Sequence, residues 1–170
     1  MKSKEQGFTL VELLVVLLII GVLLGIAFLS PITNSVHKTT KKEAVRLQVL
    51  FSQIRDQALL ENTEFGFSIS DTGQYEWWVL PVGLGPRHWK LLEEKPYQPY
   101  QLPHGYSLDL TTDEEEQSTN TGQPADHPSV VIFSDRETTP FSLALVPEKD
   151  AKETLRLKTD GLANVEIFHE

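Results

Sequence analysis

The ionisable group in the least expected place is Glu12, a single carboxylate at the start of a long apolar run. Residues 13–29 are all apolar or glycine. A carboxylate at the centre of a membrane costs roughly 2.5–3.5 kcal/mol, so it is rarely found there without a partner. Glu12 therefore either lies at the membrane boundary or pairs with a positive group inside the membrane. Its chemistry is ion pairing rather than catalysis.

Other reactive side chains do not form a recognisable catalytic pattern. The five histidines are far apart in the sequence, and no esterase, phosphate-binding or dinucleotide-binding motif appears. The acidic run at residues 113–116 could hold calcium, but it lacks the ligand spacing and turn glycine of an EF-hand. The chain also has no cysteine for a disulfide or a thiolate metal site. We expect no enzyme activity, no metal and no cofactor.

The charge balance argues against a nucleic-acid partner. The 170 residues carry a formal net charge of -9, and binding to phosphate backbones needs clustered lysines and arginines. The basic residues between 149 and 158 alternate with carboxylates, which makes a poor patch. We expect no nucleic-acid binding.

The apolar run must form the element that positions Glu12. Residues 8–29 would span about 33 Å as a helix, enough to cross a hydrocarbon core of about 30 Å. A buried core helix would need more apolar partners than the rest of the chain offers. A cleaved secretory signal is the other alternative, given Lys2, Lys4 and the small residues Gly25 and Ala27, but the apolar region of such a signal is usually only ~7–15 residues long. The sequence predicts a transmembrane helix over residues 8–30.

Residues 4–13, reading KEQGFTLVEL, resemble the leader and helix start of type IV pilins and type II secretion pseudopilins. The resemblance implies that residues 1–7 are a leader, which a prepilin peptidase removes by cutting after Gly7. The same enzyme would then N-methylate Phe8, the new first residue. Glu12 corresponds to the family's docking glutamate. Its carboxylate would pair with the Phe8 amine of an adjacent subunit, so that each charge is compensated only when subunits stack.

The lysines on the two sides of the span are nearly balanced, so charge does not decide the orientation. The resemblance places the amino end in the cytoplasm. It implies a single-pass protein of the inner membrane with its carboxyl-terminal domain in the periplasm.

The span continues into a second predicted helical segment over residues 31–62. Five apolar residues recur with helical spacing and should pack on the rest of the chain: Leu47, Leu50, Phe51, Ile54 and Ala58. Several polar residues, Arg55 among them, fall mostly off this stripe. A second, thinner set (Val45, Val49 and Leu60) points the opposite way and is either incidental surface or a contact with neighbouring subunits.

Residues 63–170 alternate with the period of β-strands and form the predicted globular domain. Loops are expected at 83–103 and 111–128. The predicted fold class is α+β, with the long amino-terminal helix packed on an antiparallel sheet or sandwich. The strands are expected at residues 65–69, 75–80, 89–92, 106–110, 130–133, 141–146, 154–158 and 164–168.

Several stretches of this domain are similar to the minor pseudopilin H family of type II secretion. The clearest is SDRETTPF at residues 134–141, where Arg136 stands at a position that is usually glycine in the family. The resemblance implies a structural subunit near the tip of the periplasmic pseudopilus of a Gram-negative bacterium. Its partners would be minor pseudopilins I, J and K and the major pseudopilin G, and the filament would push folded exoproteins through the outer-membrane secretin. Two alternatives stay open: a minor pilin of a type IV pilus, active in pilus priming or DNA uptake, and a membrane-anchored periplasmic enzyme or binding protein.

Overall fold

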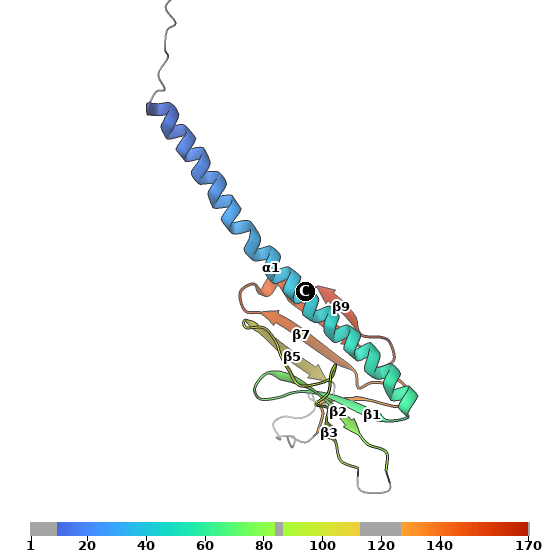
Figure 1. The fold of residues 1–170 in the computed structure, drawn as a ribbon. Helices are drawn as coiled ribbons and strands as arrows, with labels where there is room; N and C mark the ends of the chain where they lie inside the picture. Colours follow the sequence, from blue (N-terminus) through green and yellow to red (C-terminus); the bar gives the residue numbers. More distant parts are fainter. Residues whose placement is uncertain (1–9, 84–86, 113–126, 170) are drawn as a thin grey trace, which may run out of the picture.

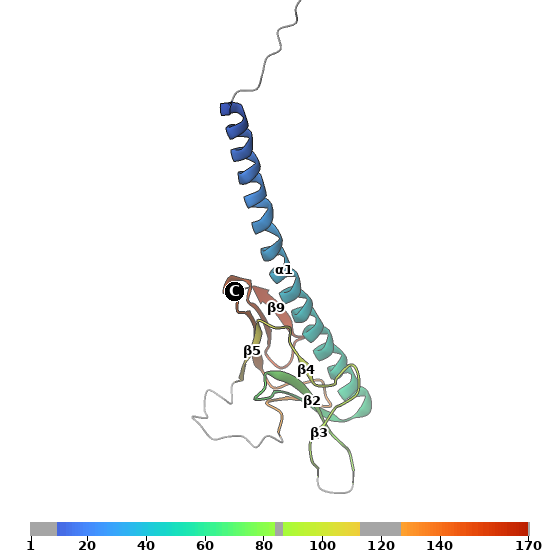
Figure 2. The same cartoon turned by 60° about the vertical axis from the view of Figure 1, so that its left-hand side comes forward.

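A single long helix carries a β-rich domain on its second half (Figure 1). The computed structural model describes residues 10–83, 87–112 and 127–169, with side chains described throughout except at 26–34. Helix α1 (Leu10–Glu61) has 52 residues, which corresponds to about 78 Å at 1.5 Å per residue. Its first half extends away from the domain, as the view in Figure 2 also shows.

The end of α1 is fixed by a left-handed residue. Asn62 has a φ of 49°, and the Thr63 amide donates to the Ala58 carbonyl at 3.1 Å. This is the pattern of a Schellman cap, which turns the chain sharply away from the helix axis. The chain can therefore enter its first strand directly, and the predicted end of the helix near residue 62 is confirmed.

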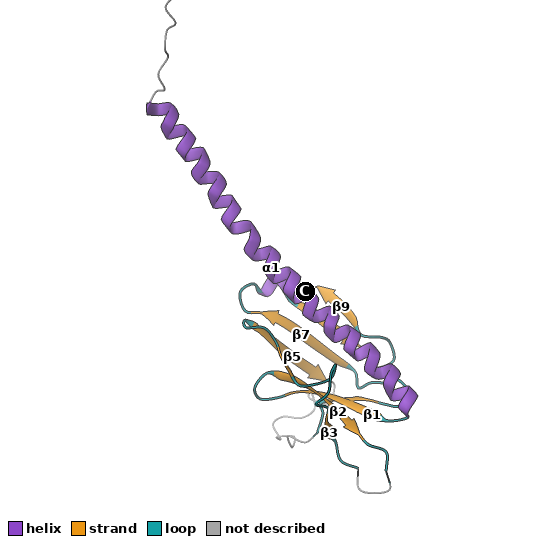
Figure 3. Cartoon of the chain, viewed as in Figure 1, coloured by secondary structure: helices purple, strands orange, loops and turns teal. Residues whose placement is uncertain are grey.

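The strands form two antiparallel sheets (Figure 3). The first has the order β3-β2-β1-β6, with β4 also paired to β2, and the second has the order β5-β7-β8-β9. A short 3-10 helix, η1 (Ala151–Glu153), precedes β8. The strands are β1 (Glu64–Ile69), β2 (Gln74–Leu80), β3 (Lys90–Leu91), β4 (Tyr100–Gln101), β5 (Tyr106–Thr112), β6 (Val130–Ile132), β7 (Phe141–Pro147), β8 (Leu155–Thr159) and β9 (Glu166–His169).

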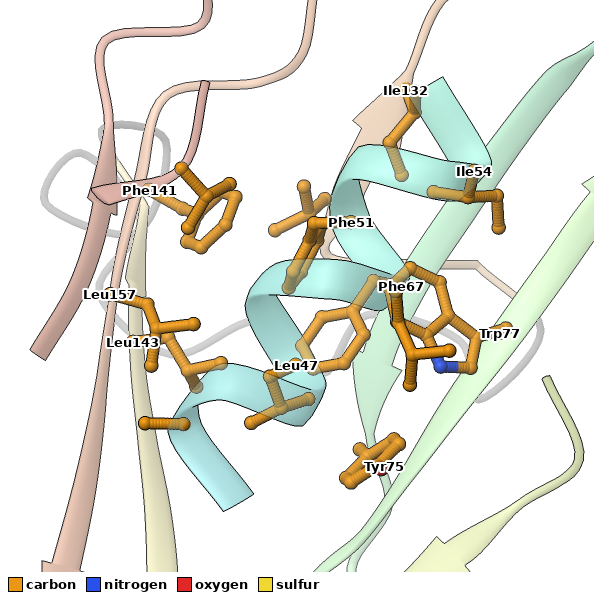
Figure 4. Packing of buried hydrophobic residues seen from close by; sticks show 14 of the residues in the cluster. Leu47, Phe51, Ile54, Phe67, Tyr75, Trp77, Ile132, Phe141, Leu143 and Leu157 are labelled. Atoms are coloured by element: carbon orange, nitrogen blue, oxygen red, sulfur yellow. The ribbon is translucent and has the colours of Figure 1, made fainter. Parts of the chain in front are cut away.

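The core lies where α1 packs against both sheets, and Phe51 is at its centre (Figure 4). Its ring lies 5.0 Å from that of Phe67 and 4.9 Å from that of Trp77, both in the first sheet. It also lies 4.8 Å from the ring of Phe141 in the second sheet. Burying an aromatic side chain of this size contributes about 1.5–3 kcal/mol. Phe51 of the helix therefore contacts both sheets.

The predicted α+β fold is confirmed, and so is the inward stripe of α1, whose five members are all buried. All eight predicted strands are present with bounds shifted by a few residues. Strand β4 was expected to be loop, because two residues are too few to show a period. Trp77 is fully buried, whereas Trp78 lies on the other face of β2 and donates to the Ser68 hydroxyl at 2.7 Å.

Candidate assembly surface

Glu12 lies in the first turn of α1. A carboxylate is favoured there, because the amino end of a helix carries partial positive charge. Gly7 and Phe8, the predicted cleavage and methylation positions, lie outside the described residues. The proposed pairing between Glu12 and a Phe8 amine thus stays a prediction.

The first half of α1 presents its apolar side chains to the outside. Every residue from 10 to 25 is exposed, and the large hydrophobic side chains among them range from 45% exposed at Val16 to 78% at Leu10. A contiguous apolar surface of this extent marks a contact with a membrane or with another protein. Within the described part of the chain, no helix combines the length and the hydropathy that a membrane span requires. The predicted span at 8–30 includes positions whose side chains are not described, and it stays a prediction.

The far end of α1 is held to the domain by Arg55. This side chain is only 4% exposed, although it lies mostly off the apolar stripe that the sequence predicts. Its guanidinium donates to the carbonyl of Arg136 from both Nε (3.0 Å) and Nη2 (2.7 Å). It also donates to the carbonyls of Leu162 (2.9 Å) and Ala163 (2.8 Å) and to Oδ1 of Asn164 (3.1 Å). Burial lowers the pKa of Arg55, and the nearby Arg136 cation lowers it further by a smaller amount.

All five N–H bonds of the guanidinium therefore have acceptors, which is the condition for burying a charge without a large penalty. A shallow hollow of about 490 Å³ is lined by this arginine and the two loops that it binds. Since each N–H donor of its guanidinium already has an acceptor within the protein, Arg55 fixes α1 to the two loops and has no donor left for a ligand.

Arg136 stands where the resemblance leads one to expect glycine, and it has a left-handed backbone conformation. Its φ is 76°, in the left-handed region where glycine is preferred. The departure from glycine is accompanied by an ion pair, in which Nη2 lies 3.1 Å from Oδ1 of Asp56 on α1. Both partners are about half exposed, so the pair contributes at most about 1 kcal/mol. The positive φ typical of a glycine position is therefore present with arginine, at the cost of some backbone strain.

A second contact fixes the short strand β4 to α1. The Arg46 guanidinium carbon lies 3.5 Å from the centroid of the Tyr100 ring, a cation–π contact. Nearby, Glu43 is 3% exposed and lies 3.7 Å from Arg46. Tyr75 completes this cluster, and burial raises the pKa of its phenol. None of these residues was singled out from the sequence.

The outward face of α1 carries the second apolar set. Val45 is 40% exposed, Val49 is 45% exposed and Leu60 is 84% exposed. The described residues therefore leave this side of the helix uncovered, as the sequence predicted.

Over the same residues, no group of three or more His, Asp or Glu side chains is placed to hold a metal ion.

Comparisons with known proteins identify both the amino-terminal motif and the whole chain. Residues 2–28 match the family described as "Prokaryotic N-terminal methylation motif". The chain is 34% identical over 174 residues to the type II secretion system protein H of Pseudomonas aeruginosa, with 96% of each chain covered. It is 24% identical to the protein of that name from Aeromonas hydrophila, with 99% of this chain and 96% of the relative covered.

Solved structures show the same fold. A structure of the minor pseudopilin EpsH from the type 2 secretion system of Vibrio cholerae matches with a TM-score of 0.58 and 22% identity, covering 76% of this chain and 96% of that one. The solution structure of Escherichia coli GspH matches with a TM-score of 0.62 and 19% identity, covering 82% and 94%.

Proposed function

Because this chain belongs to the type II secretion system protein H family, we propose that it is a structural, non-catalytic subunit near the tip of the periplasmic pseudopilus. The pseudopilus would drive folded exoproteins through the outer-membrane secretin. Prepilin peptidase would remove residues 1–7 and methylate Phe8. Residues 8–30 would cross the inner membrane, residues 31–62 would continue the rod into the periplasm, and residues 63–170 would form the periplasmic domain.

The observation that carries this proposal is the uncovered first half of α1 with one carboxylate in its first turn. The exposed side chains between Leu10 and Leu24 need an apolar environment. A membrane supplies it before assembly, and the helices of other subunits supply it afterwards. Glu12 is costly in both environments unless a cation reaches it. The methylated amine of Phe8 from an adjacent subunit is a cation placed at the same end of the rod.

The partners would be minor pseudopilins I, J and K and the major pseudopilin G. The outward valines of α1 would contact such neighbours along the filament. Their exposure and their spacing of four residues support this role, since residues i and i+4 lie on one face of a helix.

The test replaces Glu12 by Ala in a strain that lacks the chromosomal gene. We expect the variant to be processed and membrane-bound, but to lose most secretion of exoproteins, because the buried charge pair that sets the docking position is gone. Glu61→Ala is the matched control, since it removes an exposed carboxylate at the other end of the same helix. Intact mass reports cleavage after Gly7 and methylation of Phe8, and supernatant activity reports secretion.

Normal secretion by the Glu12→Ala variant would refute the docking role. Twitching motility and DNA uptake are measured in the deletion strain itself. If those activities fail while secretion is intact, the chain serves a type IV pilus instead.

A further inference from the structure

The end of the domain from which α1 emerges carries a group of exposed lysines. Contacts between distant segments define this end: Nδ1 of His37 lies 2.7 Å from a carboxylate oxygen of Glu153, and the Tyr106 hydroxyl donates to the Val36 carbonyl at 3.3 Å. Figure 1 shows η1 lying beside α1 at this level. We call the exposed lysines of these segments the basal lysines: Lys38, Lys41, Lys42, Lys149 and Lys152.

The basal lysines stand out against an acidic protein. Residues 35–42 contain three lysines and no carboxylate, whereas the whole chain has a net charge of -9. The segment at 148–153 adds two lysines and three carboxylates. Of those carboxylates, Glu153 is engaged by His37, and Asp150 accepts from the backbone amide of Lys152 at 3.3 Å. Within the described residues, none of the five lysine amines forms a salt bridge.

A small hollow opens beside these lysines. Its volume is about 150 Å³, and Thr39, His104 and Lys149 are among the residues that line it. Hydroxyl, imidazole and ammonium groups can all donate hydrogen bonds. A set of donors with a lysine suits a phosphate group, which offers only acceptor oxygens and a negative charge.

The position of the basal lysines along the rod points to the membrane surface. If the span ends at residue 30, Lys38 lies about 12 Å and Lys42 about 18 Å beyond the hydrocarbon core. The headgroup layer is about 5–8 Å thick. Lys38 then lies within about one Debye length, ~8 Å, of the lipid phosphates. A tilt of the helix, typically about 20°, brings one side of the domain closer still.

We propose that the basal lysines bind the headgroups of anionic phospholipids in the outer leaflet of the inner membrane. This contact holds the domain against the bilayer before the subunit enters the filament. It rests on the proposed span at residues 8–30. The same lysines release the membrane when the subunit moves outward, because electrostatic attraction decays within a Debye length.

The experiment uses the full chain reconstituted in vesicles of phosphatidylcholine, with or without phosphatidylglycerol. Lysines are modified with an amine-reactive reagent, and mass spectrometry measures the rate at each site. We expect modification of the basal lysines to slow at least about threefold in the anionic vesicles only, and to recover in high salt. Lys90, Lys95 and Lys158 are exposed lysines of the same chain and serve as internal controls.

A triple variant tests cooperation within the group. Lys38→Gln, Lys41→Gln and Lys42→Gln together should remove the protection of Lys149 and Lys152. Lys90→Gln, Lys95→Gln and Lys158→Gln together should leave the protection of Lys149 and Lys152 intact.

Equal protection in both kinds of vesicle, or none in either, would overturn the lipid contact while the span stands. Protection that appears only when the major pseudopilin is added would also overturn it, because the lysines would then contact a protein. A chain that fails to float with the vesicles would refute the proposed span itself, which distinguishes that failure from the others.

Discussion

Replacing Arg55 by Met tests whether this side chain fastens α1 to the domain. Methionine keeps an unbranched apolar stem in the buried site and removes all five donors. Three backbone carbonyls and one side-chain amide oxygen then lose a charged hydrogen-bond donor. They belong to the loops at 136 and 162–164, which lie side by side at one end of the second sheet, where the Thr138 amide donates to the Gly161 carbonyl at 2.9 Å.

The expected decrease in the free energy of unfolding follows from these contacts. Hydrogen bonds to charged groups contribute about 1.5–3 kcal/mol each, but they are not additive within one network. The desolvation of the guanidinium, which opposes folding, disappears in the variant. Losing several part-buried hydrogen bonds from one charged donor should cost about 3–5 kcal/mol in total. Domains of this kind are stable by only about 5–15 kcal/mol, so the variant would be marginal.

Urea unfolding of the full chain in mild detergent measures this loss through tryptophan fluorescence, to which the buried Trp77 contributes. With a slope of about 2 kcal/mol per M, a loss of 4 kcal/mol lowers the midpoint by about 2 M. Arg87→Met is the control: it removes a half-exposed arginine whose Nη2 lies 3.6 Å from Glu64, a pair worth under about 1 kcal/mol. If both variants shift the urea midpoint equally, Arg55 does not fasten α1 to the domain.

Three further changes use the same unfolding assay. Arg136→Gly should be more stable than Arg136→Ala by about 1 kcal/mol, because both lose the ion pair but only glycine relieves the left-handed backbone; equal midpoints would contradict the strain. Gly66→Ala should lower the free energy of unfolding by about 1–3 kcal/mol, since a Cβ there would overlap the ring of Pro128. The same change at Gly83, where a Cβ would meet nothing within 4 Å, should leave the stability unchanged. Equal losses at both sites would refute the close packing at Gly66. The backbone amides of Ala163 and Leu162 lower the pKa of Asp160, so its contribution to stability is present above the ordinary aspartate pKa of about 3.9 and is lost as the pH falls below it. Asp160→Asn should therefore flatten the acid side of the stability profile, and an unchanged profile would exclude this role.

The sequence was most informative where a regular pattern had a single physical cause. The inward stripe of α1 was predictable, because burial against the sheets imposes the helical period on apolar residues from Leu47 to Ala58. The strands were predictable because burial of one face of a sheet makes apolar residues alternate with a period of two. The place of Glu12 in the first turn of the helix followed from the position of the apolar run.

The anchoring contacts could not be predicted in the same way. The acceptors of Arg55 lie 81 to 109 residues away, and no local pattern distinguishes a buried arginine from a solvated one. The same limit applies to Arg46 and Tyr100, which meet through the two-residue strand β4. Arg136 stands where the family usually has glycine, which put the geometry of that turn in doubt, and the structure shows a positive φ there.

The order in which the chain is made has a consequence for how a subunit becomes usable. Helix α1 comes first, yet the groups that Arg55 binds belong to residues 136 and 162–164, near the end of the chain. The helix therefore has no complete surface to dock on until residue 164 has been synthesised. A chain without residues 136–164 would leave the inward stripe of α1 exposed and Arg55 without its acceptors, so the second half of the helix becomes fixed to the domain only after that segment has folded.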